Sequence, residues 1–146
     1  MSELSEGKLV EVRMTDEGFE GSWYEAKIVK QVGKDKFHVR YETLRTDDDE
    51  DFLEEDVDAQ NIRPSPPEII IVDNFAMTEE VDAFYNDGWW KGMVVKVLKG
   101  GRYRVYFETT EDEIVFEHSQ LRSHQDWINN TWIKKSQVYG LNFLGL

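Results

Sequence analysis

The sequence predicts an all-β protein built from two small five-stranded barrels in tandem. Three observations support this fold class: the chain repeats itself once, apolar and polar residues alternate over short stretches, and turn dipeptides separate these stretches. Five short strands in a unit of roughly 55 residues are typical of a small, strongly bent barrel rather than of a sandwich. A barrel of this size is only marginally stable alone, so we expect the two to be packed together.

The repeat is clearest between residues 23–43, WYEAKIVKQVGKDKFHVRYET, and residues 89–109, WWKGMVVKVLKGGRYRVYFET, which align without a gap. The motifs NIRP and QLRS follow them, and KLVEVRM and EEVDAFY precede them. Between the aligned segment and the NIRP motif, the first copy carries about seven more residues than the second, in an acidic run. The pattern indicates a tandem duplication, with barrel 1 at 7–66, barrel 2 at 67–135 and a tail at 136–146.

Each unit is expected to contain the same strands in the same order. The first strands centre on VEV (10–12) and VDA (81–83), where apolar and polar residues alternate. Turn dipeptides, Gly21-Ser22 and Asp87-Gly88, then lead into the second strands. The expected second, third and fourth strands are 24–32, 36–41 and 52–57 in barrel 1, and 90–98, 102–107 and 113–117 in barrel 2.

Two connecting segments carry weaker signals. PPEIII, at 66–71, is predicted to be a stiff connector whose strand pairs with both barrels. Trp127, Ile128 and Trp132 have a near-helical spacing, which predicts a short C-terminal helix or turn packed on barrel 2.

The charge of the chain restricts its partners. The formal net charge is −13, and nine of the twelve residues from Asp47 to Asp58 are acidic. Such a surface repels nucleic-acid phosphates and attracts a basic partner, which argues against direct nucleic-acid binding. No apolar run is long enough to span a membrane, and the N-terminus lacks the features of a secretory signal, so we expect an intracellular protein without a membrane association.

The sequence offers no basis for catalysis or for a cofactor. It has no cysteine, and His38, His118 and His124 stand far apart without a paired-ligand spacing. Carboxylate pairs such as Glu54 and Glu55 have no nucleophile or phosphate-binding loop beside them. We therefore expect a protein that is not an enzyme and that holds no metal and no cofactor.

The ensemble of motifs resembles a known family. The stretches that carry the likeness are VEVRMTDEGFEGSWYEAKIV, FHVRYETL, NIRPSPP, EEVDAFYNDGWWKGMVVKVL, YRVYFETTEDEIVFEHSQLRSHQDW and the trailing TW. Together they resemble the tandem Agenet pair of plant chromatin proteins, in the Tudor-like Royal superfamily, and are similar to the tandem domains of the fragile-X family. The resemblance implies Tudor-like (SH3-like) barrels and a nuclear, chromatin-bound, monomeric module of a larger protein.

What the family resemblance implies for function is a reader of a methylated lysine on the histone H3 tail. Aromatic rings would hold the methylated ammonium by cation–π contacts, and acidic residues would pair with the other basic residues of the tail. The mark that the resemblance favours is the repressive dimethylated lysine in the ARKS context, which implies a role in heterochromatin and transcriptional silencing. Two alternatives stay open: a protein–protein scaffold for a basic partner, and an RNA-binding or methylarginine-binding Tudor module.

Carried over by position, the resemblance also implies the site residues. Tyr24 and Trp90 are favoured as cage walls because they align with the wall position of simpler Tudor domains and, by strand alternation, share a face with Ile28 and Val94. Barrel 2 is less acidic around its cage position, so barrel 1, or the groove between the barrels, is expected to hold the tail. The cage candidates of barrel 1 are Phe19, Trp23, Tyr24, Tyr41 and Phe52. Those of barrel 2 are Phe84, Tyr85, Trp89, Trp90, Phe107 and Phe116. The acidic peptide-binding candidates are Asp47, Asp48, Asp49, Glu50, Asp51, Glu54, Glu55 and Asp56.

Overall fold

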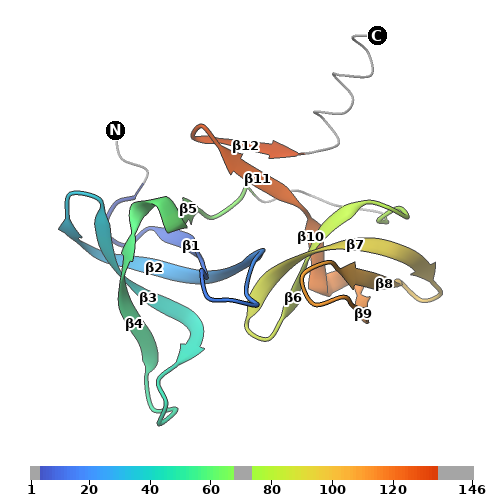
Figure 1. Cartoon of the computed structure of the whole chain (residues 1–146), viewed down its shortest axis with the longest axis horizontal. Helices are drawn as coiled ribbons and strands as arrows, with labels where there is room; N and C mark the ends of the chain where they lie inside the picture. The colour runs from blue at the N-terminus through green and yellow to red at the C-terminus, as the bar shows by residue number, and fades with distance from the viewer. Residues whose placement is uncertain (1–3, 68–73, 135–146) are drawn as a thin grey trace. The chain divides into compact units, whose positions relative to one another are not determined.

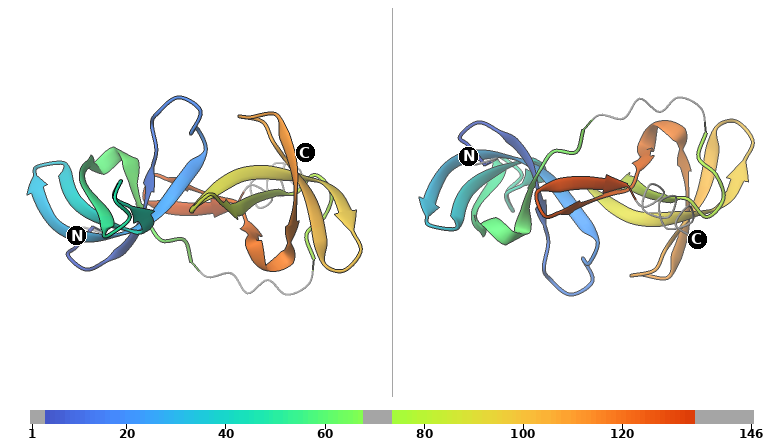
Figure 2. Two further views of the ribbon diagram at one scale, coloured as in Figure 1. Left: turned by 90° about the horizontal axis from the view of Figure 1, so that it is seen from below. Right: turned by 90° about the horizontal axis from the view of Figure 1, so that it is seen from above.

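The computed structural model describes residues 4–67 and 74–134, and nearly all regular structure in this part of the chain is β-strand. The chain divides into two compact units, Met1–Ser65 with Tyr85–Trp89, and Pro66–Phe84 with Trp90–Leu146. Strongly curved strands build each unit (Figures 1 and 2). Most of the predicted connector strand, from residue 68 on, and the predicted tail lie outside the described residues.

The strands of the first unit follow the predicted order. They are β1 (Leu9–Arg13), β2 (Ser22–Gly33), β3 (Lys36–Arg45), β4 (Phe52–Asp58) and β5 (Ile62–Pro64). Antiparallel pairing joins β1 to β2, β2 to β3 and β3 to β4, and β5 returns beside β1. A single 3-10 turn, Ala59–Asn61, leads from β4 into β5. The five-stranded unit is the one that the sequence predicts.

The second unit repeats this order. Its strands are β6 (Glu80–Tyr85), β7 (Gly88–Leu98), β8 (Arg102–Phe107), β9 (Asp112–Glu117) and β10 (Leu121–Ser123). β10 returns beside β6 as β5 does beside β1, and a 3-10 turn, His118–Gln120, precedes it. Among the described residues no helix exceeds one such turn, so none has the length or the apolar character needed to cross a bilayer.

Both units bend their longest strand at the same place. The register of β2 against β3 shifts between Ile28 and Lys30, and that of β7 against β8 shifts between Val94 and Lys96, which are the aligned positions of the repeat. A β-bulge of this kind increases the local twist and lets one strand curve around a small core. The same irregularity is therefore present at matching positions in both copies of the repeat.

Each unit has its own apolar core, formed by the inward-facing residues of its alternating strands. In the first unit, β1, β2 and β3 contribute Val10, Ile28 and Val39, each no more than 2% exposed. In the second, Val81, Val94 and Val105 lie at the same places in the repeat and are also fully buried.

The C-terminal segment is a β-hairpin. The sequence predicts a short helix or a turn here. A turn is present, and the prediction of a helical extension is wrong. β11 (Gln125–Ile128) and β12 (Thr131–Lys134) pair with each other, with Trp127 directly opposite Trp132. Their ring centroids lie 5.3 Å apart. Asn129 and Asn130 both have positive φ, 51° and 61°, as a two-residue hairpin turn requires. Two tryptophans that suggested one helical face are therefore cross-strand neighbours.

The turn before β7 is displaced by one residue from its predicted position. Asn86 and Asp87, both with positive φ (49° and 68°), form the tight turn, and Gly88 is already in the strand. Gly88 is buried, and a β-carbon at this position would lie 2.6 Å from the ring of Tyr24. The glycine is required because the backbone passes directly against that ring.

Candidate functional site

The five aromatic candidates of barrel 1 differ in how much of their rings reaches the surface. Phe19, in the turn before β2, is 40% exposed, whereas Tyr24 is 3% exposed and Tyr41 is fully buried. Trp23, at the start of β2, and Phe52, at the start of β4, are half-buried. A ring can contact a ligand only through exposed surface, so Phe19, Trp23 and Phe52 are the accessible members of the set.

Tyr41 connects the core to the acidic strand. Its hydroxyl donates a hydrogen bond to Oε2 of Glu55 on β4. Burial, the hydrogen bond to Glu55 and the negative charge of Glu55 all raise the pKa of Tyr41 above its ordinary value, so the phenol stays protonated. Tyr41 therefore holds one of the predicted acidic residues in a defined orientation.

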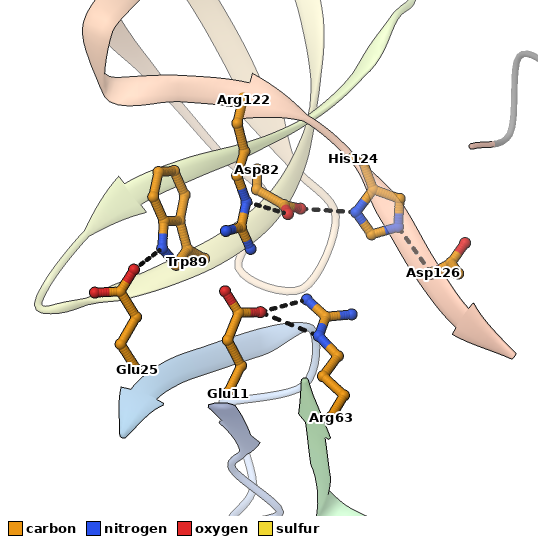
Figure 3. Close-up of polar contacts among 8 residues, drawn as sticks. All are labelled: Glu11, Glu25, Arg63, Asp82, Trp89, Arg122, His124 and Asp126. Atoms are coloured by element: carbon orange, nitrogen blue, oxygen red, sulfur yellow. Dashed lines mark hydrogen bonds and ion pairs between the residues drawn. The ribbon is translucent and has the colours of Figure 1, made fainter. Parts of the chain in front are cut away.

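Trp23 already carries a cation over its ring. The guanidinium carbon of Arg63 lies 3.7 Å from the ring centroid. Arg63 is buried, and its Nε and Nη2 donate to Oε1 of Glu11 at 3.0 and 2.8 Å. Glu11 and Arg63 are register partners on β1 and β5 (Figure 3). One ring face of Trp23 is thus covered by a buried ion pair that fastens the first strand to the last.

Phe52 also lies beside arginines, but at the surface. The guanidinium carbon of Arg45 is 4.3 Å from the ring centroid of Phe52, and that of Arg40 is 5.5 Å away. Both distances fall within the roughly 6 Å range of cation–π attraction. The charge partners of these arginines are distant and exposed: Arg45 Nε lies 3.9 Å from Asp49, and Arg40 Nε lies 4.0 Å from Glu54.

The eight predicted acidic residues of barrel 1 are all exposed, in the loop between β3 and β4 and along β4. The loop is ordered by its own hydrogen bonds: the Thr46 hydroxyl donates to Oδ1 of Asp48 at 2.5 Å, and the same oxygen accepts from the Glu50 amide at 3.1 Å. These bonds, the one from Thr46 first, lower the pKa of Asp48 below its ordinary value. The loop that precedes Phe52 therefore presents the carboxylate of Asp48 in its ionised form.

His38 lies among the acidic residues of β4. Its Nδ1 is 2.7 Å from Asp56 and its Nε2 is 2.8 Å from Glu54. The hydrogen bonds to Asp56 and to Glu54 raise the pKa of His38 above its ordinary value. This contact could not be predicted from the sequence, because it depends on the register of β3 against β4.

The aromatic candidates of barrel 2 divide into core and surface residues. Phe107 and Phe116 are 5% and 3% exposed and pack edge to face, with ring centroids 5.9 Å apart. Trp90 is half-buried against the same core, and Phe84 is half-buried. Tyr85 is 40% exposed.

Trp89 and Trp90 therefore have different roles. Residues Tyr85–Trp89 cluster with the first unit, and there Trp89 donates from Nε1 to Oε2 of Glu25 on β2 at 3.0 Å (Figure 3). In the same segment, the backbone oxygen of Asp87 accepts a hydrogen bond from Thr43 at 2.7 Å. One tryptophan of the pair thus packs on the second core, and the other completes the surface of the first unit.

The second unit has its own buried charge network, at the position of Glu11 and Arg63 in the repeat. Asp82 on β6 accepts from Arg122 Nε at 3.0 Å and lies 2.7 Å from His124 Nδ1 (Figure 3). His124 Nε2 is in turn 2.9 Å from Asp126 on β11. Burial opposes protonation of His124, but the hydrogen bond to Asp82 and the charges of Asp82 and Asp126 outweigh it and raise its pKa.

Sequence reasoning missed these two networks, although a signal was present. The repeat aligns Glu11 with Asp82 and Arg63 with Arg122, so a carboxylate and an arginine recur at matching places in the first and last strands. In the described part of the chain, these networks included, no group of three or more histidine and carboxylate side chains is arranged to hold a metal ion.

Comparison with known proteins agrees with this geometry. The family model described as the Agenet domain matches the chain twice, at residues 7–67 and 78–126. Among curated proteins, the chain is 45% identical over 130 residues to Protein AGENET DOMAIN (AGD)-CONTAINING P1 of Arabidopsis thaliana, covering 89% of this chain and 25% of that protein. It is 41% identical over 131 residues to DUF724 domain-containing protein 3 of the same plant, covering 86% of this chain and 19% of the relative. The chain thus spans about a quarter or less of these relatives.

Two solved structures are similar over most of the chain. The crystal structure of Arabidopsis thaliana AGDP1 AGD34 matches with a TM-score of 0.85 and 42% identity, covering 90% of this chain and 89% of that one. The crystal structure of ADCP1 tandem Agenet domain 3-4 matches with a TM-score of 0.80 and 40% identity, covering 90% and 87%. The double family match and the agreement in fold lead to one conclusion: the chain belongs to the Agenet domain family and carries two Agenet domains in tandem.

Proposed function

We propose that the chain is a non-enzymatic chromatin reader, and that its first unit binds a histone H3 tail carrying a methylated lysine. The observation that carries this proposal is the environment of Phe52. Its half-buried ring already has a guanidinium carbon at 4.3 Å, and the exposed carboxylates from Asp47 to Asp51 directly precede it. A ring that attracts a cation within an acidic loop has the chemistry that a methylated basic peptide needs.

The exposure of each aromatic ring in the first unit determines the role that we propose for it. Phe19, Trp23 and Phe52 present ring surface to the ligand, while Tyr24 and Tyr41 support the site from within the unit. A methylated ammonium keeps its charge but loses hydrogen-bond donors, so aromatic faces suit it better than carboxylates do. Unmodified lysines and arginines of the tail pair with the acidic loop. Two or three ring contacts with a few ion pairs correspond to a dissociation constant on the order of ten micromolar.

The relatives support the choice of partner. They are plant proteins that carry the same tandem Agenet unit, and the family resemblance implies chromatin binding in the nucleus. Within that frame we propose the repressive dimethylated lysine in the ARKS context as the mark, with heterochromatin and gene silencing as the setting. The single tandem unit acts here as a binding module of a longer protein.

Calorimetric titration tests the proposal. The protein is titrated with H3 tail peptides that are unmodified or methylated at each common lysine, and the experiment is repeated with Phe52→Leu and with Tyr41→Phe. We expect one methylated peptide to bind several-fold more tightly than its unmodified form, with this preference lost in Phe52→Leu. Tyr41→Phe frees Glu55 but keeps the core ring, so it should weaken binding only modestly.

Two double variants that remove the same number of charges separate the effect of the acidic loop on peptide binding from the effect of the net charge. Asp47→Asn with Asp49→Asn removes two carboxylates beside Phe52, whereas Glu111→Gln with Asp112→Asn removes two at the corresponding turn of the second unit. We expect only the first pair to weaken peptide binding strongly. Equal binding of all peptides by the wild type would reject the reader and favour an acidic scaffold for a basic partner.

A further inference from the structure

Two arginines of the first unit lie over aromatic rings, and they are held very differently. Arg63 lies 3.7 Å from the centroid of Trp23, and Arg45 lies 4.3 Å from that of Phe52. In each case the guanidinium occupies the kind of position that a ligand cation would take on an aromatic face. Whether a ligand could replace the arginine depends on what else holds it.

Arg63 cannot be replaced without disrupting the unit. Its side chain is 3% exposed, and its partner Glu11 is 1% exposed, with two donor contacts of 3.0 and 2.8 Å between them. Removing the arginine from this position would break a buried ion pair, which is strongly unfavourable. The cation over Trp23 is therefore structural.

In the described part of the chain, the side chain of Arg45 has no comparable buried ion pair. Its side chain is 45% exposed, and its ion-pair partner Asp49 is 84% exposed at a distance of 3.9 Å. Exposed ion pairs of this length contribute little, because solvent screens them and both side chains lose freedom to form them. The face of Phe52 and the surrounding acidic loop are the main attraction for Arg45, and both are also available to another cation.

We propose that the face of Phe52 is a cation site that Arg45 fills when no ligand is bound, and that the methylated lysine of a bound peptide replaces Arg45 there. This inference rests on the proposed function and names a competitor within the same site. Once displaced from the ring, Arg45 can keep its ion pair with an exposed carboxylate of its loop, Asp49. A methylated ammonium is weakly hydrated and gains more from the ring than a strongly hydrated unmodified ammonium does.

This competition makes Arg45 a determinant of specificity. The apparent dissociation constant of a ligand rises in inverse proportion to the fraction of protein whose site is open. An exposed cation–π contact corresponds to a factor of about 2 to 5 in that fraction. Only a ligand that needs the ring is affected, so Arg45 weakens the methylated peptide and leaves a peptide bound through the carboxylates alone unchanged.

The first test is titration of Arg45→Met with the methylated and unmodified peptides. Because the substitution also makes the protein more negative, Arg104→Met is the matched control: Arg104 is similarly exposed (41%) and lies 3.9 Å from Glu113 in the second unit. We expect Arg45→Met to bind the methylated peptide about 2 to 5 times more tightly than Arg104→Met does. The unmodified peptide should bind both variants equally.

The double variant Arg45→Met, Phe52→Leu locates the effect at the ring. If Arg45 competes for Phe52, the gain from Arg45→Met disappears when Phe52 is already leucine. A gain that persists without the ring, or a loss of affinity in Arg45→Met, overturns the inference, because it would mean that Arg45 acts through charge alone or orients the site.

A spectroscopic readout makes the inference independent of the histone peptide. In the free protein, the side-chain protons of Arg45 should show ring-current shifts that vanish in Phe52→Leu. Adding the peptide, or Nα-acetyl-trimethyllysine as a small cationic probe, should remove these shifts. If the wild type shows no preference for a methylated peptide but the probe still displaces Arg45, the proposed function fails and the cation site stands. Shifts that survive saturation by both ligands overturn the cation site.

Discussion

Gly88 shows how closely single residues are fitted in the first unit. A β-carbon there would lie 2.6 to 2.8 Å from three ring atoms of Tyr24, which is itself 3% exposed. We therefore expect Gly88→Ala to lower the free energy of unfolding by about 1–3 kcal/mol, as overpacking of a core does. Thermal or urea unfolding measures this. Gly33→Ala is the control, because its β-carbon would meet its nearest neighbour at an ordinary 3.6 Å, and an equal loss there would contradict the steric explanation.

The buried pair of Glu11 and Arg63 leads to a second prediction at the residue scale. Glu11→Gln removes the negative charge from a side chain that is 1% exposed and breaks its ion pair with the guanidinium over Trp23. We expect a loss of about 3 kcal/mol or more in the free energy of unfolding. Glu113→Gln, which breaks an exposed pair with Arg104, should cost no more than about 1 kcal/mol. Similar losses in urea unfolding of the two variants would show that burial does not set the strength of the pair.

At the scale of elements, His124 joins three strands of the second unit. It follows β10 directly, and its two ring nitrogens lie against Asp82 on β6 and Asp126 on β11. The pKa of His124 is raised, so the protonated ring stabilises the folded state fully below the unfolded value of 6.5, and this contribution is lost as the pH rises through the folded pKa. Lys91 opposes the shift, and Arg122 binds Asp82 as well.

The expected result is a stability difference that depends on pH. Relative to the wild type, His124→Gln should be less stable by on the order of 1 kcal/mol near pH 6, and the difference should shrink as the pH is raised. Urea unfolding of both proteins across this range measures it, and the difference between them cancels the other titrating groups. The stability of His38→Gln is measured for comparison with that of His124→Gln. The pKa of His38 is also raised, but its partners are exposed carboxylates. A difference that stays constant with pH would rule out the charged histidine.

The strands could be predicted from the sequence because the pattern of each strand occurs in both copies of the repeat. Val10 and Val81, or Val39 and Val105, occupy matching core positions, so each copy supports the assignment of the other. The C-terminal hairpin has no such copy, and the spacing of Trp127 and Trp132 fits a helix face and a cross-strand pair equally. The pairing of β11 with β12 and the positive φ of Asn129 and Asn130, which are properties of the folded backbone, distinguish the two.

The candidate site was predictable only in part, because the exposure of each ring depends on the fold of the whole molecule. Composition locates the acidic loop and aligned aromatics supply candidates, but exposure decides which rings a ligand can reach. Tyr24 and Tyr41 are covered by their unit, whereas Phe52 is not. The arginines over Trp23 and Phe52 come from strands far away in sequence or from a loop end, so strand register had to be known first.

Charge is the property of the whole molecule that bears most directly on binding. The chain has 30 acidic and 17 basic side chains, which gives the net charge of −13, and eight exposed carboxylates lie within residues 47–56, on both sides of Phe52 in the sequence. We expect peptide affinity to fall as salt is raised from about 0.1 M to 1 M, because the screening length shortens from roughly 10 Å to 3 Å. The preference for a methylated peptide should survive, since contact with a ring acts at short range.

Titration at several salt concentrations separates these two parts of the interaction. In the wild type, the affinities for methylated and unmodified peptides should fall together and keep a nearly constant ratio. In Asp47→Asn with Asp49→Asn the salt dependence should be shallower at an unchanged ratio, whereas in Phe52→Leu the ratio should approach one with the wild-type salt dependence. Affinity that does not respond to salt would mean that an apolar interface, and not the acidic loop, binds the partner.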